Sequence, residues 1–251
     1  MGTAVGARAS AAGDQSIAVA AHATAKATRA LSVCSYSYSG AEGGIALGYN
    51  SMVADGASGS TAIGAGSVVS GKNSGVWNAS PASGQPQNML DANRSFVGGD
   101  NNYAIGNKNI IGDKSSDSFV LGNNVKLGAS GATLAITNVA GQDAITNAST
   151  RTNTVTYTNT TPVTGAVALG SDTSVTVNNG VALGKSSVAS TAAGQAGTDP
   201  LSAKDATASA GVWTATHAAV SVGNGTTVTR QITSVATDTQ DTDAVNEKKK
   251  K

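Results

Sequence analysis

Charged and aromatic side chains are scarce in this chain. Of 251 residues, 12% are charged and 4% aromatic, and 16 Lys and Arg against 15 Asp and Glu give a net charge of +1. Nucleic-acid-binding proteins carry clustered Lys and Arg, so we expect no nucleic-acid partner. The one basic run, residues 248–251, follows Glu247 abruptly, and we interpret 247–251 as a possible added tail.

Long apolar runs and reactive side chains are also missing. No stretch approaches the roughly 18 apolar residues of a transmembrane helix, so we expect no membrane contact by this fragment. A single cysteine, Cys34, permits no disulfide within the chain. The two histidines, His22 and His217, have no metal-binding or nucleophile spacing around them. We therefore expect no catalytic residue, no metal, no cofactor and no enzymatic activity.

Glycine is abundant, with 31 residues, and it closes a repeated five-residue element typified by Gly-Ile-Ala-Leu-Gly. The first five copies follow one another at steps of 14, 14, 14 and 16 residues. The final residues of the copies are Gly6, Ala20, Cys34, Gly48, Gly64, Gly106, Gly122, Gly170 and Gly184. A degenerate copy, Ser-Phe-Val-Gly-Gly, ends at Gly99. A fixed period of this kind predicts a repeat architecture.

Each repeat predicts two short strands and two turns. Apolar residues alternate in the first strand, where Ile45 and Leu47 flank Ala46, which indicates two distinct faces. We expect the larger residues to form an inner layer and the alanine to lie where another backbone approaches. Stacking such coils gives an all-β parallel solenoid. Because one coil carries only two or three sizeable apolar side chains, we also expect self-association as a symmetric oligomer.

Two interruptions break the repeat and divide the chain. The first, residues 72–94, is expected to be a surface loop, and the second, residues 126–165, to contain additional extended strands in a threonine-rich segment. The predicted organisation is a head over 1–190, a connector over 191–219 and a neck over 220–246.

The repeat, followed by the segment VSVGNGTTVTRQITSVATDTQDTDAVN over 220–246, resembles the head and neck of trimeric autotransporter adhesins, the YadA-like surface proteins of Gram-negative bacteria. The resemblance implies a homotrimer of left-handed parallel β-rolls, with insertions and a neck leading to a coiled-coil stalk. It also implies a location on the bacterial cell surface, as the extracellular passenger of an outer-membrane protein. The partners would be host cell-surface receptors or extracellular matrix proteins, bound multivalently. Signal peptide, stalk and membrane barrel are expected outside this chain.

Candidate ligand-binding residues are large side chains in a chain of small ones. Tyr36 and Tyr38 alternate and are expected to point to one exposed face, where they could supply binding area. Trp77, Met89 and Leu90 lie in the first interruption and are alternative contacts. The neck residues expected to hold the trimer together are Arg230, Ile232, Val235, Asp243 and Val245.

Two other interpretations are weaker. Segments at 105–116 and 121–132 look like the hexapeptide repeats of trimeric acyltransferases, but no histidine base lies near them and the step of 14 is not a multiple of six. An ice-binding solenoid would use the threonines of residues 150–161. It needs threonine at the same place in successive coils, an array that the sequence lacks.

Overall fold

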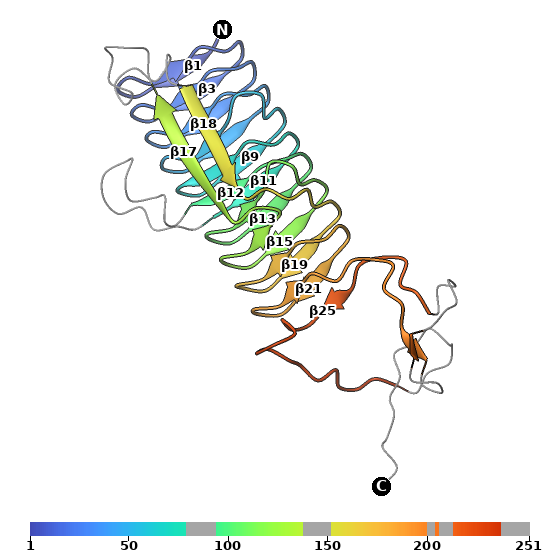
Figure 1. Ribbon diagram of the computed structural model, residues 1–251. Helices are drawn as coiled ribbons and strands as arrows, with labels where there is room; N and C mark the ends of the chain where they lie inside the picture. Colours follow the sequence, from blue (N-terminus) through green and yellow to red (C-terminus); the bar gives the residue numbers. More distant parts are fainter. Residues whose placement is uncertain (79–93, 138–151, 200–203, 206–212, 237–251) are drawn as a thin grey trace.

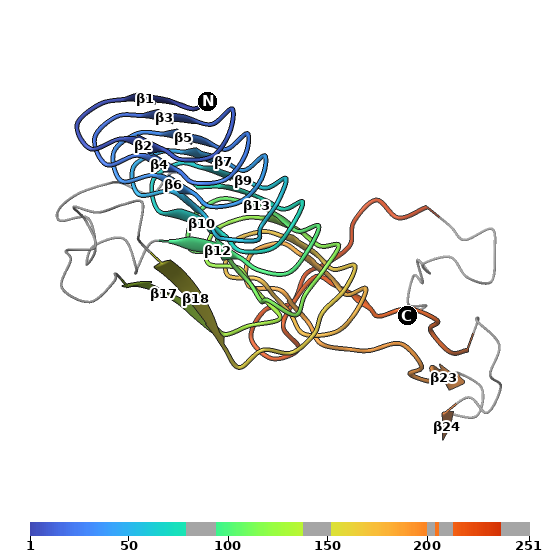
Figure 2. The same cartoon turned by 90° about the horizontal axis from the view of Figure 1, so that it is seen from above.

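The computed structural model describes residues 1–78, 94–137, 152–199, 204–205 and 213–236. This part of the chain is all-β and contains no helix. It forms a parallel solenoid of about 11 coils, in which each coil except the last contributes one strand to sheet A and the next strand to sheet B. Figure 1 shows the coils stacked as a rod, and Figure 2 shows the two sheets from above.

Sheet A has eleven strands and sheet B has ten. Sheet A consists of β1 (Thr3–Val5), β3 (Ile17–Val19), β5 (Leu31–Val33), β7 (Ile45–Leu47), β9 (Thr61–Ile63), β11 (Gly75–Trp77), β13 (Tyr103–Ile105), β15 (Phe119–Leu121), β19 (Val167–Leu169), β21 (Val181–Leu183) and β25 (Val220–Ser221). Sheet B consists of β2 (Ser10–Ala11), β4 (Thr24–Ala25), β6 (Tyr38–Ser39), β8 (Met52–Val53), β10 (Ser67–Val69), β12 (Ser95–Val97), β14 (Ile110–Ile111), β16 (Lys126–Leu127), β20 (Ser174–Val175) and β22 (Val188–Ala189).

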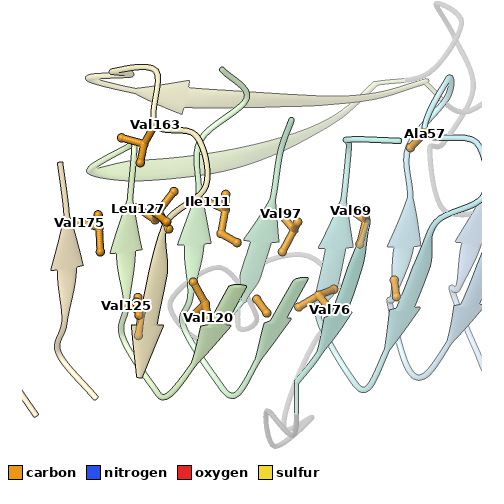
Figure 3. Packing of buried hydrophobic residues seen from close by; sticks show 14 of the residues in the cluster. Ala57, Val69, Val76, Val97, Ile111, Val120, Val125, Leu127, Val163 and Val175 are labelled. Carbon is orange, nitrogen blue, oxygen red and sulfur yellow. The ribbon is translucent and has the colours of Figure 1, made fainter. Parts of the chain in front are cut away.

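The core is narrow and runs the length of the rod between the sheets. The middle residue of each sheet A strand points inward, and it is small or β-branched, as with Ala46, Ala62 and Val76. Larger residues of sheet B, such as Val97 and Ile111, face them (Figure 3). The expectation that the larger residues of the first strand form the inner layer was therefore wrong. The larger side chains of sheet B fill most of the core. The inward positions of sheet A therefore accept mainly alanine or valine.

Each coil turns through backbone conformations with positive φ. In the repeated glycine position, Gly48 has φ 138°, and a Cβ there would lie 2.6 Å from the carbonyl carbon of Gly64 in the next coil. Ala20 and Cys34 occupy the same position with φ of 96° and 91°. These two coils therefore make the turn in a conformation that costs a non-glycine residue about 1 to 3 kcal/mol.

Buried asparagine side chains link consecutive coils. The Asn102 side-chain amide donates to the carbonyls of Gly98 at 2.7 Å and Ser115 at 2.8 Å, and its Oδ1 accepts from the backbone N–H of Ser118 at 3.0 Å. Asn109 makes the corresponding bonds one turn later, to Ile105, Gly122 and Val125. Both side chains satisfy backbone groups that a coil corner would otherwise leave unpaired in the interior.

The first interruption begins later than expected. Residues 75–77 were assigned to the insertion, but they form β11, which pairs in register with β9 and β13. The Ser-Phe-Val-Gly-Gly segment is not a degenerate first strand, because residues 95–97 are β12 in sheet B. Trp77 is followed by Asn78 and not by glycine, which hid the repeat. The interruption therefore falls between the two strands of one coil, β11 and β12.

The second interruption contains the extended strands that the threonine-rich sequence predicted, although residues 126–127 form β16 and belong to the solenoid. β17 (Gly131–Thr137) and β18 (Thr152–Thr158) pair as an antiparallel hairpin, which lies along the outer face of sheet B (Figures 1 and 2). Its base is closed by the Thr161 N–H, which donates to the Gly128 carbonyl at 2.9 Å.

The C-terminal part leaves the rod and returns to it. After β22 comes a short antiparallel pair, β23 (Thr198–Asp199) and β24 (Lys204–Asp205), and β25 then extends sheet A beside β21. Arg230 folds back over the last coil, where its guanidinium donates to the Ser187 hydroxyl at 3.0 Å and to the Lys185 and Val222 carbonyls. These bonds cover carbonyls that no further coil pairs with.

Candidate functional site

The outer face of sheet A is an apolar surface that nothing in the described structure covers. The first and third residues of each strand point outward, and they form two columns along the rod. The first column contains Thr3, Ile17, Leu31, Ile45, Thr61, Gly75, Tyr103, Phe119, Val167, Val181 and Val220, and the second contains Val5, Val19, Val33, Leu47, Ile63, Trp77, Ile105, Leu121, Leu169 and Leu183. We call these the first and second outer columns.

The large side chains of these columns are partly exposed, and several are open to solvent. Trp77 is 52% exposed, Tyr103 50% and Leu121 46%, whereas Ala104 and Val120 between the columns are buried. An apolar surface that extends along a whole rod is rare on monomeric proteins and marks an interaction surface. Of these residues, the sequence predicted only Trp77 as a binding candidate. The alternation in each repeat pointed to the others, but we expected their side chains to face the core.

The outer face of sheet B is apolar over four consecutive strands, and there the hairpin covers it. Tyr38, Met52, Val68 and Phe96 point outward from four consecutive strands, each 2% exposed or less. Ala132, Leu134, Val155 and Tyr157 of the hairpin pack against them. The Tyr157 hydroxyl lies 2.8 Å from the Ser70 hydroxyl, and its desolvation raises its pKa well above the usual range.

The expected exposed face carrying both Tyr36 and Tyr38 does not exist. Tyr38 is buried beneath the hairpin, and its hydroxyl donates to Asp55 Oδ1 at 2.5 Å. Asp55 also forms an ion pair with Lys26 at 2.6 Å. Tyr36 lies in the preceding turn with φ 62°, and β6 begins only at Tyr38. The turn interrupts the period of two, so the two rings point in different directions.

Tyr36 instead belongs to an aromatic cluster at the turns. Its ring stacks on His22 with centroids 4.8 Å apart and planes at 5°, and it meets the edge of Tyr49 at 6.0 Å and 82°. His22 and Tyr36 occupy the same turn position in successive coils, both with positive φ. Desolvation, with a smaller contribution from Tyr36, raises the pKa of Tyr49. The three half-buried rings form a patch suited to stacking contacts.

The other candidate residues are dispersed. Met89 and Leu90 lie outside the described residues, as do Asp243 and Val245. Ile232 is 69% exposed and Val235 is half-buried, in a segment without regular secondary structure. Arg230 lies at the end of the rod, where it caps the last coil as described above.

The described residues contain no group of three or more His, Cys, Asp or Glu side chains that could hold a metal ion. Within the same ranges no helix has the length and apolarity needed to span a membrane. Cys34 is a free, half-buried thiol in a turn. Neither a protein-family model nor a curated protein matches the chain.

Proposed function

We propose that this chain is the head of a trimeric autotransporter adhesin, displayed on a bacterial surface and attaching to host cell receptors or extracellular matrix. The observation that carries the proposal is the uncovered apolar face of sheet A. The sequence adds the 14-residue repeat and the neck-like segment at 220–246 that follows it. In this proposal the rods are left-handed, the chain is not an enzyme, and it contacts neither nucleic acid nor membrane.

The contrast between the two sheets supports self-association. Both outer faces carry large apolar side chains, and on sheet B the chain's own hairpin covers the four strands that carry most of them. The other face extends over eleven strands, so a partner must match a rod with the same 14-residue spacing. A second and third copy of the chain have that spacing, and three parallel copies around one axis would bury all three sheet A faces.

Attachment would use surfaces that point away from such an axis. The outer side of the hairpin presents Thr133, Thr154 and Thr156, and the turns present the Tyr36 cluster. Three copies of each surface on one head, and many heads on one cell, convert weak contacts into avid binding.

The first test is the solution mass of the purified chain by light scattering. We expect three times 24.4 kDa. Leu47→Asp places a charge in the sheet A face, where the Leu47 side chain points away from the core and is 39% exposed, and it is expected to yield a folded monomer. Thr156→Asp, which adds the same charge on the hairpin, is the matched control and should remain a trimer. A wild-type monomer would overturn the assembly.

The second test measures attachment to immobilised fibronectin, to immobilised collagen and to intact host cells. We expect saturable binding by the wild type and its loss in Leu47→Asp, because that variant presents one copy of each attachment surface in place of three. Leu47→Met is the matched control, since it changes the same side chain without adding a charge, and it should keep both the trimer and the binding.

Two outcomes would overturn the attachment role. The first is equal binding by the monomeric Leu47→Asp variant, which would show that multivalency contributes nothing. The second is the absence of saturable binding to all three surfaces by a chain that light scattering shows to be a trimer.

A further inference from the structure

One strand of sheet A combines the smallest and the largest outward side chains of the rod. β11 carries Gly75 in the first outer column and Trp77 in the second. In the neighbouring strands the same two positions hold Thr61 and Ile63 in β9, and Tyr103 and Ile105 in β13. The apolar face therefore has one notch and one knob at the same level.

The backbone does not require glycine at residue 75. Gly75 is absent from the residues with positive φ, and it pairs in the parallel ladder with Thr61 and Tyr103. A Cβ there would lie 3.0 Å from Cδ1 of the half-exposed Tyr103 side chain and 3.9 Å from the Thr61 carbonyl oxygen. Neither a turn nor a close approach of two backbones explains the glycine. It leaves space outside the sheet, part of which the edge of the Tyr103 ring occupies.

An open depression of about 310 Å³ adjoins Gly75, and the Tyr103 ring forms one of its walls. Its walls include Thr61, Ile63, Tyr103, Ile105 and Phe119, so it is mainly apolar and partly aromatic. Trp77 lies at its rim and is 52% exposed, so its own indole does not fill the depression. An apolar side chain from outside the chain can enter it.

We propose that Trp77 of each subunit inserts into the notch above Gly75 of the neighbouring copy, and that this contact fixes the axial register of the assembly. The inference rests on the proposed trimer. In a cyclic assembly of parallel rods, one side of each subunit meets the opposite side of the next. The second outer column of one copy therefore faces the first outer column of its neighbour, at the same coil.

The register follows from the residues on either side. Moving one copy by a single coil places Trp77 against Tyr103 or Thr61, and leaves the Gly75 notch facing Ile63 or Ile105. The first shift crowds two aromatic rings, and either shift leaves an apolar cavity that the smaller isoleucine fills less well. Most other levels carry two aliphatic side chains of similar size, so they discriminate weakly between registers.

The first experiment measures the environment of Trp77 directly. The chain has two tryptophans, and Trp213→Phe leaves Trp77 as the single tryptophan. We expect blue-shifted emission and strong protection from acrylamide quenching in the trimer, and loss of both when Leu47→Asp is added to separate the subunits. A trimer in which Trp77 is quenched as readily as in that monomer would overturn the insertion.

The second experiment exchanges the two side chains. Trp77→Gly removes the knob and Gly75→Trp fills the notch, and each is expected to weaken assembly at least about tenfold, since buried tryptophans dominate interfaces. The double variant Gly75→Trp/Trp77→Gly restores the complementarity in the opposite sense and should recover the trimer. Sedimentation equilibrium gives the dissociation constants, and circular dichroism checks that each variant folds.

The outcomes separate the two proposals. A wild-type trimer whose double variant is as weak as the worse single variant would overturn the insertion and leave the proposed function standing. That result would assign Gly75 to the packing of Tyr103 within its own subunit. A wild-type monomer would remove the proposed function and this inference together.

Discussion

The close approach of consecutive coils predicts a large penalty for Gly48→Ala. At φ 138° the new side chain adopts a backbone conformation that costs about 1 to 3 kcal/mol. Its Cβ would also lie 2.6 Å from the Gly64 carbonyl carbon and 2.8 Å from its oxygen, so two backbones must move apart. Alanine also lowers the conformational entropy of the unfolded chain, which stabilises the folded state by about 0.4 to 1 kcal/mol. Forcing extra atoms into a packed site costs a further about 1 to 3 kcal/mol. Together these effects predict a net loss of about 2 to 4 kcal/mol in the free energy of unfolding.

A comparison with Gly56 separates the cost of the steric clash at Gly48 from the cost of its backbone conformation. Gly56 also has positive φ, 85°, but a Cβ there would meet nothing within 4 Å. Gly56→Ala should therefore cost only about 1 kcal/mol, the conformational part alone. Urea unfolding followed by circular dichroism, at one fixed protein concentration, gives both values. Equal losses in the two variants would show that the coils do not approach each other closely enough at Gly48 to matter.

Three further changes test other parts of the fold. Ala20→Gly should raise the unfolding free energy by about 1 kcal/mol, because φ 96° suits glycine; a loss in urea unfolding would contradict this. Phe96→Ala opens the core beneath the hairpin, and thermal unfolding should show a loss of about 3 to 5 kcal/mol, whereas an unchanged midpoint would refute that packing. Burial raises the pKa of Tyr157 in the folded state, so its contribution is complete below the unfolded pKa of about 10 and falls at higher pH. Tyr157→Phe should flatten this alkaline loss, and an unchanged pH profile would argue against it.

The solenoid was predictable because its signal is periodic. The steps of 14 and 16 residues place each strand, and the structure pairs the repeats in the register that the sequence alignment gives, as with Ile17 beside Leu31. The alternation identified two faces but could not say which one is inside. Size suggested that Ile45 and Leu47 are inner residues, but the width of the core is set by sheet B, whose valines and isoleucines leave room for Ala46.

The binding candidates were harder to predict, because they depend on contacts between distant segments. Tyr38 looked exposed, since the sequence does not reveal that a hairpin starting at Gly131 covers it. A signal for this cover did exist in sheet B. Met52, Val68 and Phe96 are large residues at the outward position of consecutive strands, a pattern that predicts a second packed layer.

The hairpin also changes how the rod responds to force. In a solenoid each coil contacts only its neighbours, so a pull at one end can peel the coils away singly, each at a low tension. The hairpin packs across β6, β8, β10 and β12 together. These four coils therefore share an applied force with the hairpin. To peel one of them away, the force must also break its contacts with the hairpin. We therefore expect this section of the rod to resist force best.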